Sequence, residues 1–179
     1  MTTLLGLAAL LLLWASPSSA AAACPSLLDH KYTTLQGDTV NLCEFADRPI
    51  LVVNTASKCG YTPQFEKLEG MYRKYRDRGL VVLGFPSNDF RQELATNKEI
   101  GDFCRLTYQV QFPMIEKSAV TGEAADPFYK QLRAATGQVV RWNFHKYLIT
   151  PGGTQVYSFT TRVEPDAPEI MSKLLPLLK

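Results

Sequence analysis

The residue best placed to do chemistry is Cys59, which lies between an apolar run at residues 50–53 and the dipeptide Thr62-Pro63. The run is typical of a buried strand, and we expect a helix with Thr62 as N-cap and Pro63 as first residue. The partial positive charge and free N–H groups of a helix start stabilise a thiolate, and Lys58 adds a positive charge. Such a thiolate can attack a peroxide O–O bond or a disulfide. Position alone leaves equally open that Cys59 is an apolar filler of the core.

Four cysteines, at positions 24, 43, 59 and 104, and two histidines are spread along the chain without a C-x-x-C pair or a Cys/His cluster. We therefore expect no structural zinc site and no cofactor. A thioredoxin-type oxidoreductase needs a second thiol at position 62, which is Thr62. A peroxiredoxin would have Pro at position 52 and Thr or Ser at position 56, where this chain has Val52 and Ala56. Neither pattern fits.

Residues 1–23 have the features of a cleavable secretory signal. Residues 4–15 are apolar but too short for a bilayer span of roughly 20 residues, and small residues follow them. Cleavage near residues 20–23 would leave a mature chain that is secreted or periplasmic. Two alternatives stay open: a buried N-terminal helix, and an acylated anchor on Cys24.

Residues 24–179 are expected to form one domain. The formal net charge of +2 gives no reason to expect nucleic acid or an acidic membrane surface as a partner. A turn at residues 35–38 predicts a hairpin of residues 31–34 and 39–42. Further strands are predicted at residues 50–53, 80–85, 144–149 and 155–159.

Helices are predicted to alternate with these strands. One begins at Thr62 and ends at Gly79, and a second begins at a capping box of Thr96 and Glu99. A short helix is expected around residues 127–134, and a last one runs from residue 167 with Asp166 as its cap. The order predicts an α/β fold with a central mixed sheet flanked by helices, and it points to the thioredoxin-like class.

The chain contains three ordered motifs: VNTASKCGYT at residues 53–62, LGFPSNDF at 83–90 and WNFHKYL at 142–148. Together they closely resemble the motifs of glutathione peroxidases that carry cysteine rather than selenocysteine. The resemblance extends from about residue 31 to the C-terminus. It implies a thiol peroxidase that reduces hydrogen peroxide and organic or lipid hydroperoxides.

The resemblance also implies roles for individual residues. Cys59 would be the peroxidatic nucleophile, with Trp142 and Asn143 as the polar partners of its thiolate. An indole N–H donates, and an amide can donate to sulfur. Donors directed at a thiolate stabilise it and help to position the peroxide oxygen. Without the motif, Trp142 would be interpreted as core packing at the start of a strand.

One candidate catalytic residue departs from the family pattern: Asp89 stands where the family usually has Gln. An ionised carboxylate only accepts hydrogen bonds, and its charge disfavours a nearby thiolate. Either Asp89 turns away and a backbone N–H substitutes for it, or it is protonated or paired with a cation such as Lys58. Residues 91–94 also replace the usual Gly and Pro, so the loop conformation is not predicted.

Attack on a hydroperoxide would leave a sulfenic acid on Cys59. The resemblance implies that Cys104 resolves it as a disulfide, whereas helical periodicity alone would make Cys104 a buried filler. Cysteines with Cα atoms more than about 7 Å apart need backbone movement to be bridged, so the helix from Thr96 would have to loosen. In an oxidising compartment Cys24 and Cys43 could form a structural disulfide. The alternative is two unpaired thiols.

The short segment between Pro113 and Trp142 resembles family members that lack the oligomerisation loop. It implies a monomer that prefers a thioredoxin-like reductant, with glutathione as the second choice and no stable membrane insertion. Two other functions stay open on the same fold, namely a thiol–disulfide oxidoreductase and a non-catalytic redox sensor.

Overall fold

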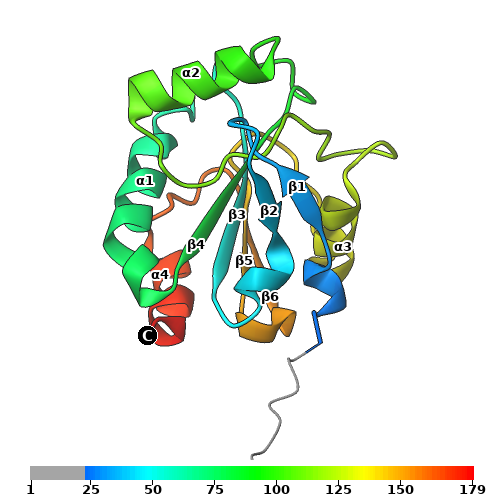
Figure 1. The fold of residues 1–179 in the computed structure, drawn as a ribbon, viewed down its shortest axis with the longest axis vertical. Coiled ribbons are helices and arrows are strands. Elements are labelled where there is room, and N and C mark those ends of the chain that lie inside the picture. Colours follow the sequence, from blue (N-terminus) through cyan, green and yellow to red (C-terminus); the bar gives the residue numbers. More distant parts are fainter. Residues whose placement is uncertain (1–22) are drawn as a thin grey trace, which may run out of the picture.

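The computed structural model describes residues 23–179, so almost all of the expected signal segment lies outside the described residues. A four-stranded sheet forms the centre, in the order β4-β3-β5-β6 (Figure 1). β3 (Ile50–Thr55) pairs in parallel with β4 (Val81–Pro86) and antiparallel with β5 (Lys146–Ile149). β5 pairs antiparallel with β6 (Val156–Phe159). The predicted mixed sheet is confirmed.

The predicted hairpin is also confirmed. It consists of β1 (Lys31–Thr33) and β2 (Thr39–Asn41), which pair only with each other. An isolated bridge joins Thr34 at its tip to Ile115, and a second bridge joins Gly84 of β4 to Met114. The hairpin tip is therefore connected to the sheet through the segment around residues 114–115.

Within residues 23–179, four α-helices cover the two faces of the sheet: α1 (Gln64–Tyr75), α2 (Asn97–Tyr108), α3 (Pro127–Thr136) and α4 (Pro168–Leu174). Side chains alternate along β3, so Leu51 and Val53 join one apolar cluster while Ile50 and Val52 join the other. The first cluster includes side chains of α1, α2 and α4, and the second includes side chains of α3 and the hairpin. Figure 1 shows α1 and α4 on one side of the sheet and α3 on the other.

Two predicted helix starts are wrong. α1 begins at Gln64, after Pro63, and no side chain caps it. The predicted cap, Thr62, does not serve because its hydroxyl is used within the preceding loop. α4 begins at Pro168 after Ala167, also without a side-chain cap. Asp166 instead forms an ion pair with Lys67 of α1, 3.1 Å apart. A tertiary partner therefore replaced the local one.

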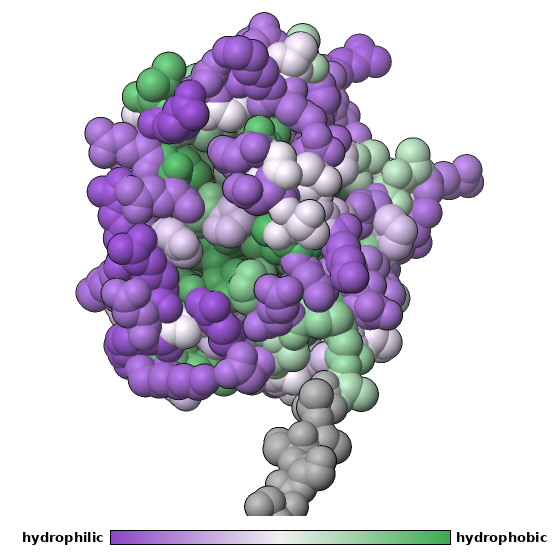
Figure 2. Space-filling model, in the orientation of Figure 1, coloured by the Kyte–Doolittle hydropathy of each residue, from purple (hydrophilic) through white to green (hydrophobic). Residues whose placement is uncertain are grey.

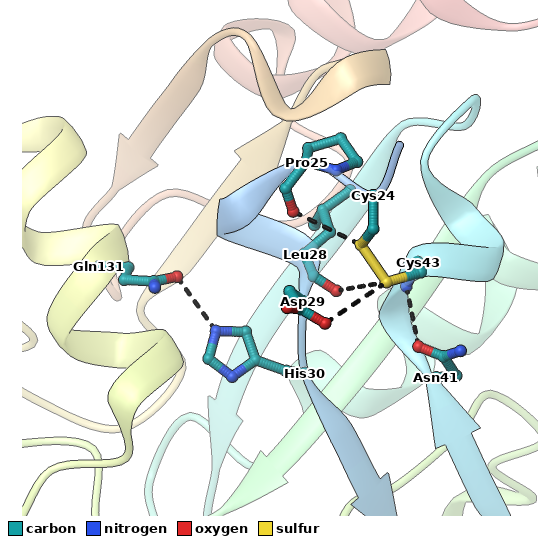
Figure 3. The surroundings of a disulfide bond; sticks show 8 residues. All are labelled: Cys24, Pro25, Leu28, Asp29, His30, Asn41, Cys43 and Gln131. Carbon is teal, nitrogen blue, oxygen red and sulfur yellow. Dashed lines mark hydrogen bonds between the residues drawn. A yellow bond between two sulfur atoms is a disulfide. The ribbon is translucent and has the colours of Figure 1, made fainter. Parts of the chain in front are cut away.

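The expected disulfide is present between Cys24 and Cys43, with Cα atoms 5.3 Å apart (Figure 3). Cys43 lies in the 3-10 turn Leu42–Phe45, which precedes β3 in the chain. Together with Asp29, these cysteines are the only potential metal-ligand cluster found in residues 23–179, but their sulfur atoms are bonded to each other.

The surface seen in Figure 2 is mostly hydrophilic, with apolar side chains at the bottom of a central hollow. Within residues 23–179, none of the helices combines the length and the apolar character needed to span a bilayer.

Candidate active site

Cys59 lies in the loop that joins the end of β3 to the start of α1. The loop is closed by the Thr62 hydroxyl, which accepts from the Cys59 N–H at 3.0 Å and donates to the carbonyl of Ala56 at 2.9 Å. This turn directs the Cys59 sulfur toward the N–H of Tyr61, at 3.4 Å. Cys59 is only 7% exposed, so the residue is largely shielded from water.

The segment that contains Trp142 and Asn143 is held against the end of β3 by Asn54. The Asn54 side chain donates to the carbonyl of Trp142 at 3.2 Å and accepts from the N–H of His145 at 3.0 Å. Its main-chain carbonyl accepts from the N–H of Phe144 at 2.7 Å. Because β3 leads directly into the Cys59 loop, these three bonds bring two distant parts of the sequence to one end of the sheet.

The main chain turns sharply at Phe144, between Asn143 and His145. Its φ of 61° lies in the left-handed region, which is unusual for a bulky residue. The conformation is retained because the ring is fully buried and packs edge-on against Phe65 of α1, with ring centroids 5.3 Å apart. The same helix thus anchors both the Cys59 loop and the strand that follows Asn143.

The Trp142 ring does not fill the core, which excludes the packing interpretation of this residue. It is 40% exposed and contacts the ring of Phe90, with centroids 5.2 Å apart. Trp142 and Tyr61 line the same hollow of about 610 Å³. Its other lining residues include the exposed Val139 and the cationic side chains Arg141 and Arg162.

Asn143 is fully buried, and its amide is held by Gln92. The Asn143 Nδ2 group donates to Gln92 Oε1 at 2.8 Å, whereas Asn143 Oδ1 has no partner within the described residues. The Asn143 carbonyl accepts from the hydroxyl of Thr161 at 2.7 Å. Main chain and side chain are therefore both fixed, and one buried acceptor is left open.

The Asp89 carboxylate is directed elsewhere. Its Oδ2 atom accepts from the N–H groups of Val120 at 2.7 Å and Thr121 at 2.8 Å, and from the Thr121 hydroxyl at 3.0 Å. Of the two arrangements considered from the sequence, these bonds support the one in which Asp89 turns away. The backbone donor that the sulfur does receive is the N–H of Tyr61.

Gln92 and Glu93, two neighbouring residues in the segment after Asp89, hold the residues that precede Cys59. The carbonyl of Gln92 accepts from the N–H of Lys58 at 2.9 Å, and the Glu93 carboxylate accepts from the N–H of Ser57 at 3.0 Å. Glu93 is buried, and this burial raises the pKa of its carboxyl despite the hydrogen bonds that it accepts. The segment that sequence analysis left unassigned is therefore part of the site's framework.

Comparison with known proteins shows to which family this chain belongs. The family description "Glutathione peroxidase" matches residues 27–133. The chain belongs to the glutathione peroxidase family. A glutathione peroxidase from Lactococcus lactis is 42% identical over 79% of this chain and 93% of its own length. A hydroperoxy fatty acid reductase from Synechocystis is 39% identical over 80% of this chain and 90% of its own.

The solved structures agree with this assignment. The crystal structure of T. cruzi GPX1 has 30% identity and a TM-score of 0.66, and the match covers 85% of this chain and 95% of that one. The protein is thus a thiol peroxidase with a thioredoxin-like fold, as the sequence predicted.

Cys104 of this peroxidase lies on the buried face of α2, 3% exposed. It belongs to the same apolar cluster as Cys59, and both cysteines are free thiols. Burial and, to a smaller extent, the charge of Glu93 raise the pKa of the Cys104 thiol to about 12. Cys104 is therefore protonated and unreactive while α2 keeps this position.

Sequence reasoning named Cys59, Trp142, Asn143, Asp89 and Cys104 but missed the residues that position them. Asn54 lies within the first motif and could have been noticed as a polar residue at the end of an apolar strand. Gln92 and Glu93 lie in the segment that departs from the family pattern, and no local signal marked them.

Proposed function

We propose that Cys59 is the peroxidatic nucleophile of this thiol peroxidase. The observation that carries the proposal is the turn that places its sulfur beside the Tyr61 N–H, in the loop just before α1 begins at Gln64. The thiolate attacks the distal oxygen of a hydroperoxide, the O–O bond breaks, and the alkoxide takes a proton. The products are a Cys59 sulfenic acid and an alcohol, or water when the substrate is hydrogen peroxide.

Trp142 and Asn143 serve as polar partners in this step. Asn143 keeps a second N–H and an open Oδ1, so it can both donate to and accept from a hydroperoxide. The hollow beside Trp142 suits organic substrates, since apolar and cationic side chains line it together. The name of the Synechocystis relative supports fatty acid hydroperoxides as one substrate class. Asp89 contributes only by fixing the loop at residues 120–121.

The test is stopped-flow oxidation of the reduced protein by hydrogen peroxide, with Cys59→Ser as the control. We expect loss of the Cys59 thiol at a rate far above that of free cysteine, and no corresponding phase in the variant. A rate equal to that of free cysteine would exclude the peroxidase role of Cys59. Insulin reduction, run in parallel, would detect a thiol–disulfide oxidoreductase instead.

We propose further that Cys104 resolves the sulfenic acid. Its thiol attacks the Cys59 sulfur, a disulfide forms, and the hydroxyl leaves with the Cys104 proton as water. Both cysteines belong to one cluster, which supports this pairing, but Cys104 is buried and protonated, so α2 must loosen first. Cys104→Ser should trap a Cys59 sulfenic acid that dimedone labels. Peroxide-treated parent protein without a Cys59–Cys104 peptide in mass spectra would remove the step.

For the reductant, we propose a thioredoxin-like dithiol that acts on a monomeric peroxidase, with glutathione as the weaker donor. The proposed Cys59–Cys104 disulfide would lie beneath a loosened α2. This position favours a protein donor that can bind the surface of that helix. Turnover measured side by side with thioredoxin and glutathione would test this, and faster turnover with glutathione would reverse the order. Sedimentation would test the monomer.

We also propose that the chain is exported and cleaved near residues 20–23. The Cys24–Cys43 disulfide supports an oxidising compartment, because such bonds are rare where cytosolic thiols keep cysteines reduced. Expression of the full chain followed by N-terminal mass analysis should give a mature start at residue 21, 23 or 24. An intact Met1 in an intracellular protein would contradict export.

A further inference from the structure

Three side chains that can bind a metal ion lie close together near the N-terminal end of the described residues. They are Cys24, Asp29 and Cys43, and one sulfur or oxygen atom from each lies within 4.8 Å of the other two (Figure 3). The two cysteines are separated by 19 residues, so their spacing along the chain gave no sign of this cluster. The fold assembles it by pairing the turn Leu42–Phe45 with the segment before β1.

The main chain on both sides of the cluster is held independently of the disulfide. Leu28 is buried in the second apolar cluster, which fixes the residue that follows it. The N–H of Cys43 donates to the Asn41 side chain at 3.3 Å, and the N–H of Leu42 donates to the carbonyl of His30 at 3.0 Å. Side chains on such a backbone need only rotate in order to change partners.

The spacing of the three ligand atoms fits a tetrahedral zinc ion. Bonds of about 2.3 Å to sulfur and about 2.1 Å to oxygen place a sulfur about 3.6 Å from an oxygen and two sulfurs about 3.8 Å apart. The Asp29 Oδ1 atom already lies 3.9 Å from the Cys43 sulfur. Because the Cα atoms of Cys24 and Cys43 are 5.3 Å apart, side-chain rotation can separate their sulfurs by this distance once the S–S bond is broken.

The donor set selects zinc over harder cations. Two thiolates and one carboxylate suit Zn²⁺, whereas Mg²⁺ and Ca²⁺ bind in sites made of oxygen atoms. His30 takes no part, because its Nε2 atom contacts Gln131 Oε1 at 3.0 Å and Figure 3 shows its ring directed toward α3. Asp29 is exposed and both cysteines are half-buried, so a metal ion and a water as fourth ligand can reach the site.

We propose that Cys24, Asp29 and Cys43 form a zinc site when the disulfide is reduced. A protein dithiol gives two electrons and two protons to the Cys24–Cys43 bond, becomes a disulfide itself and leaves two thiols on this chain. Zn²⁺ then binds both sulfurs and the Asp29 carboxylate, and the two thiol protons pass to solvent. The metal holds the N-terminal segment where the covalent bond held it before. The site is independent of the peroxidase reaction, since Cys59 and Cys104 belong to the other apolar cluster.

The experiment measures Zn²⁺ binding by competition with a chromophoric chelator, before and after reduction with a phosphine. The parent protein should bind one Zn²⁺ per chain when it is reduced and none when it is oxidised. Cys59→Ser/Cys104→Ser should behave in the same way, which excludes the thiols of the active site. Cys24→Ser/Cys43→Ser should bind none in either state.

A second pair of variants tests the carboxylate while the disulfide stays available. Asp29→Asn should lower the zinc affinity of the reduced protein by at least about 10-fold, since loss of an outer partner alone has such an effect. Asp38→Asn makes the same exchange in the exposed hairpin turn and should leave the affinity unchanged. Zinc should also raise the unfolding temperature of the reduced parent but not of the oxidised parent, because a ligand stabilises only the state that binds it.

The reduction step is tested by incubating the oxidised parent with reduced thioredoxin and then alkylating it. Mass spectra should show label on Cys24 and Cys43, and added zinc should protect both thiols. The proposal is overturned if thioredoxin leaves this disulfide intact, if the reduced parent binds no zinc, or if Asp29→Asn and Asp38→Asn bind zinc equally well. None of these outcomes bears on the proposed function, which is tested by the oxidation rate of Cys59.

Discussion

Ionisable side chains next to the site lose their charge more readily than usual because they are buried. Lys146 of β5 is fully buried, and its ammonium donates to the carbonyls of Thr161 at 3.3 Å and Val163 at 2.6 Å. Burial lowers the pKa of Lys146 to about 7. Thr161 in turn donates its hydroxyl to the carbonyl of Asn143, so this lysine supports the main chain of the site.

His145, the neighbour of Lys146, makes stability depend on pH. Burial first, and the Lys146 charge second, lower the pKa of His145 from 6.5 to about 4. Between these values the unfolded chain binds a proton that the native protein does not. The free energy of unfolding should therefore fall as pH falls from about 6.5 to 4, by at most about 1.4 kcal/mol per pH unit from this group.

Urea unfolding at pH 7 and pH 5 measures this effect, with His145→Gln as the comparison. Glutamine keeps a polar group for the Ser158 hydroxyl, which contacts His145 Nε2 at 2.8 Å, but it cannot be protonated. The variant should lose less stability than the parent between the two pH values. Equal losses would show that His145 does not cause the pH dependence.

At the scale of elements, the position of α2 keeps the free thiols of Cys104 and Cys59 from reacting with each other. It holds Cys104 on its buried face together with Ile100, while Leu106 on the same helix is 75% exposed. Its first turn is stabilised by the capping box, in which the Thr96 hydroxyl accepts from the Glu99 N–H at 3.2 Å and Glu99 accepts from the Thr96 N–H at 2.9 Å. The rate of resolution should therefore depend on how firmly this helix start is held.

Thr96→Ala removes the hydroxyl of the capping box and should destabilise the start of α2 by about 1 kcal/mol. If loosening of α2 limits disulfide formation, Cys59–Cys104 bond formation after a peroxide pulse should speed up about fivefold. Quenched-flow mass spectrometry follows the bond, and Thr96→Ser, which keeps a cap, should match the parent. A faster helix opening by hydrogen exchange without faster bond formation would contradict the prediction.

Across the whole molecule, the structural disulfide and the active site lie at opposite ends of the sheet. Cys43 of the disulfide precedes the start of β3 in the chain, and Cys59 follows the end of the same strand. The disulfide fixes the N-terminal segment, whose Leu28 packs fully buried in the cluster beneath α3 and the hairpin. Its contribution should therefore be to stability rather than to the reaction.

Replacing both residues, in Cys24→Ser/Cys43→Ser, should lower the free energy of unfolding by about 3 kcal/mol. The estimate follows from the entropy of closing a loop with a sequence separation of 19 residues. Urea unfolding measures the loss, and the peroxide rate of the folded variant should equal that of the parent. A slower rate in the folded variant would show that the disulfide also influences Cys59.

Features that depend on neighbours in the sequence could be predicted. The apolar run before Cys59 gave the buried strand, and Thr96 with Glu99 gave the capping box, because both follow from the period of side chains and from one turn of backbone. The cysteine at the strand-to-helix junction was found for the same reason. Thr62 and Asp166 were misassigned as helix caps because other partners bind their side chains: Ala56 in the same loop binds Thr62, and Lys67 of α1 binds Asp166.

By itself, therefore, the sequence determined the mixed α/β fold and the family, and it singled out Cys59 as the candidate nucleophile. Tertiary structure decided which side chains surround that cysteine. A carboxylate at position 89 and an amide at position 92 differ by three residues, yet a turn at Arg91 sends one to Val120 and the other to Asn143. Their directions depend on hydrogen-bond partners far away in the chain, and these partners meet only when the sheet has formed.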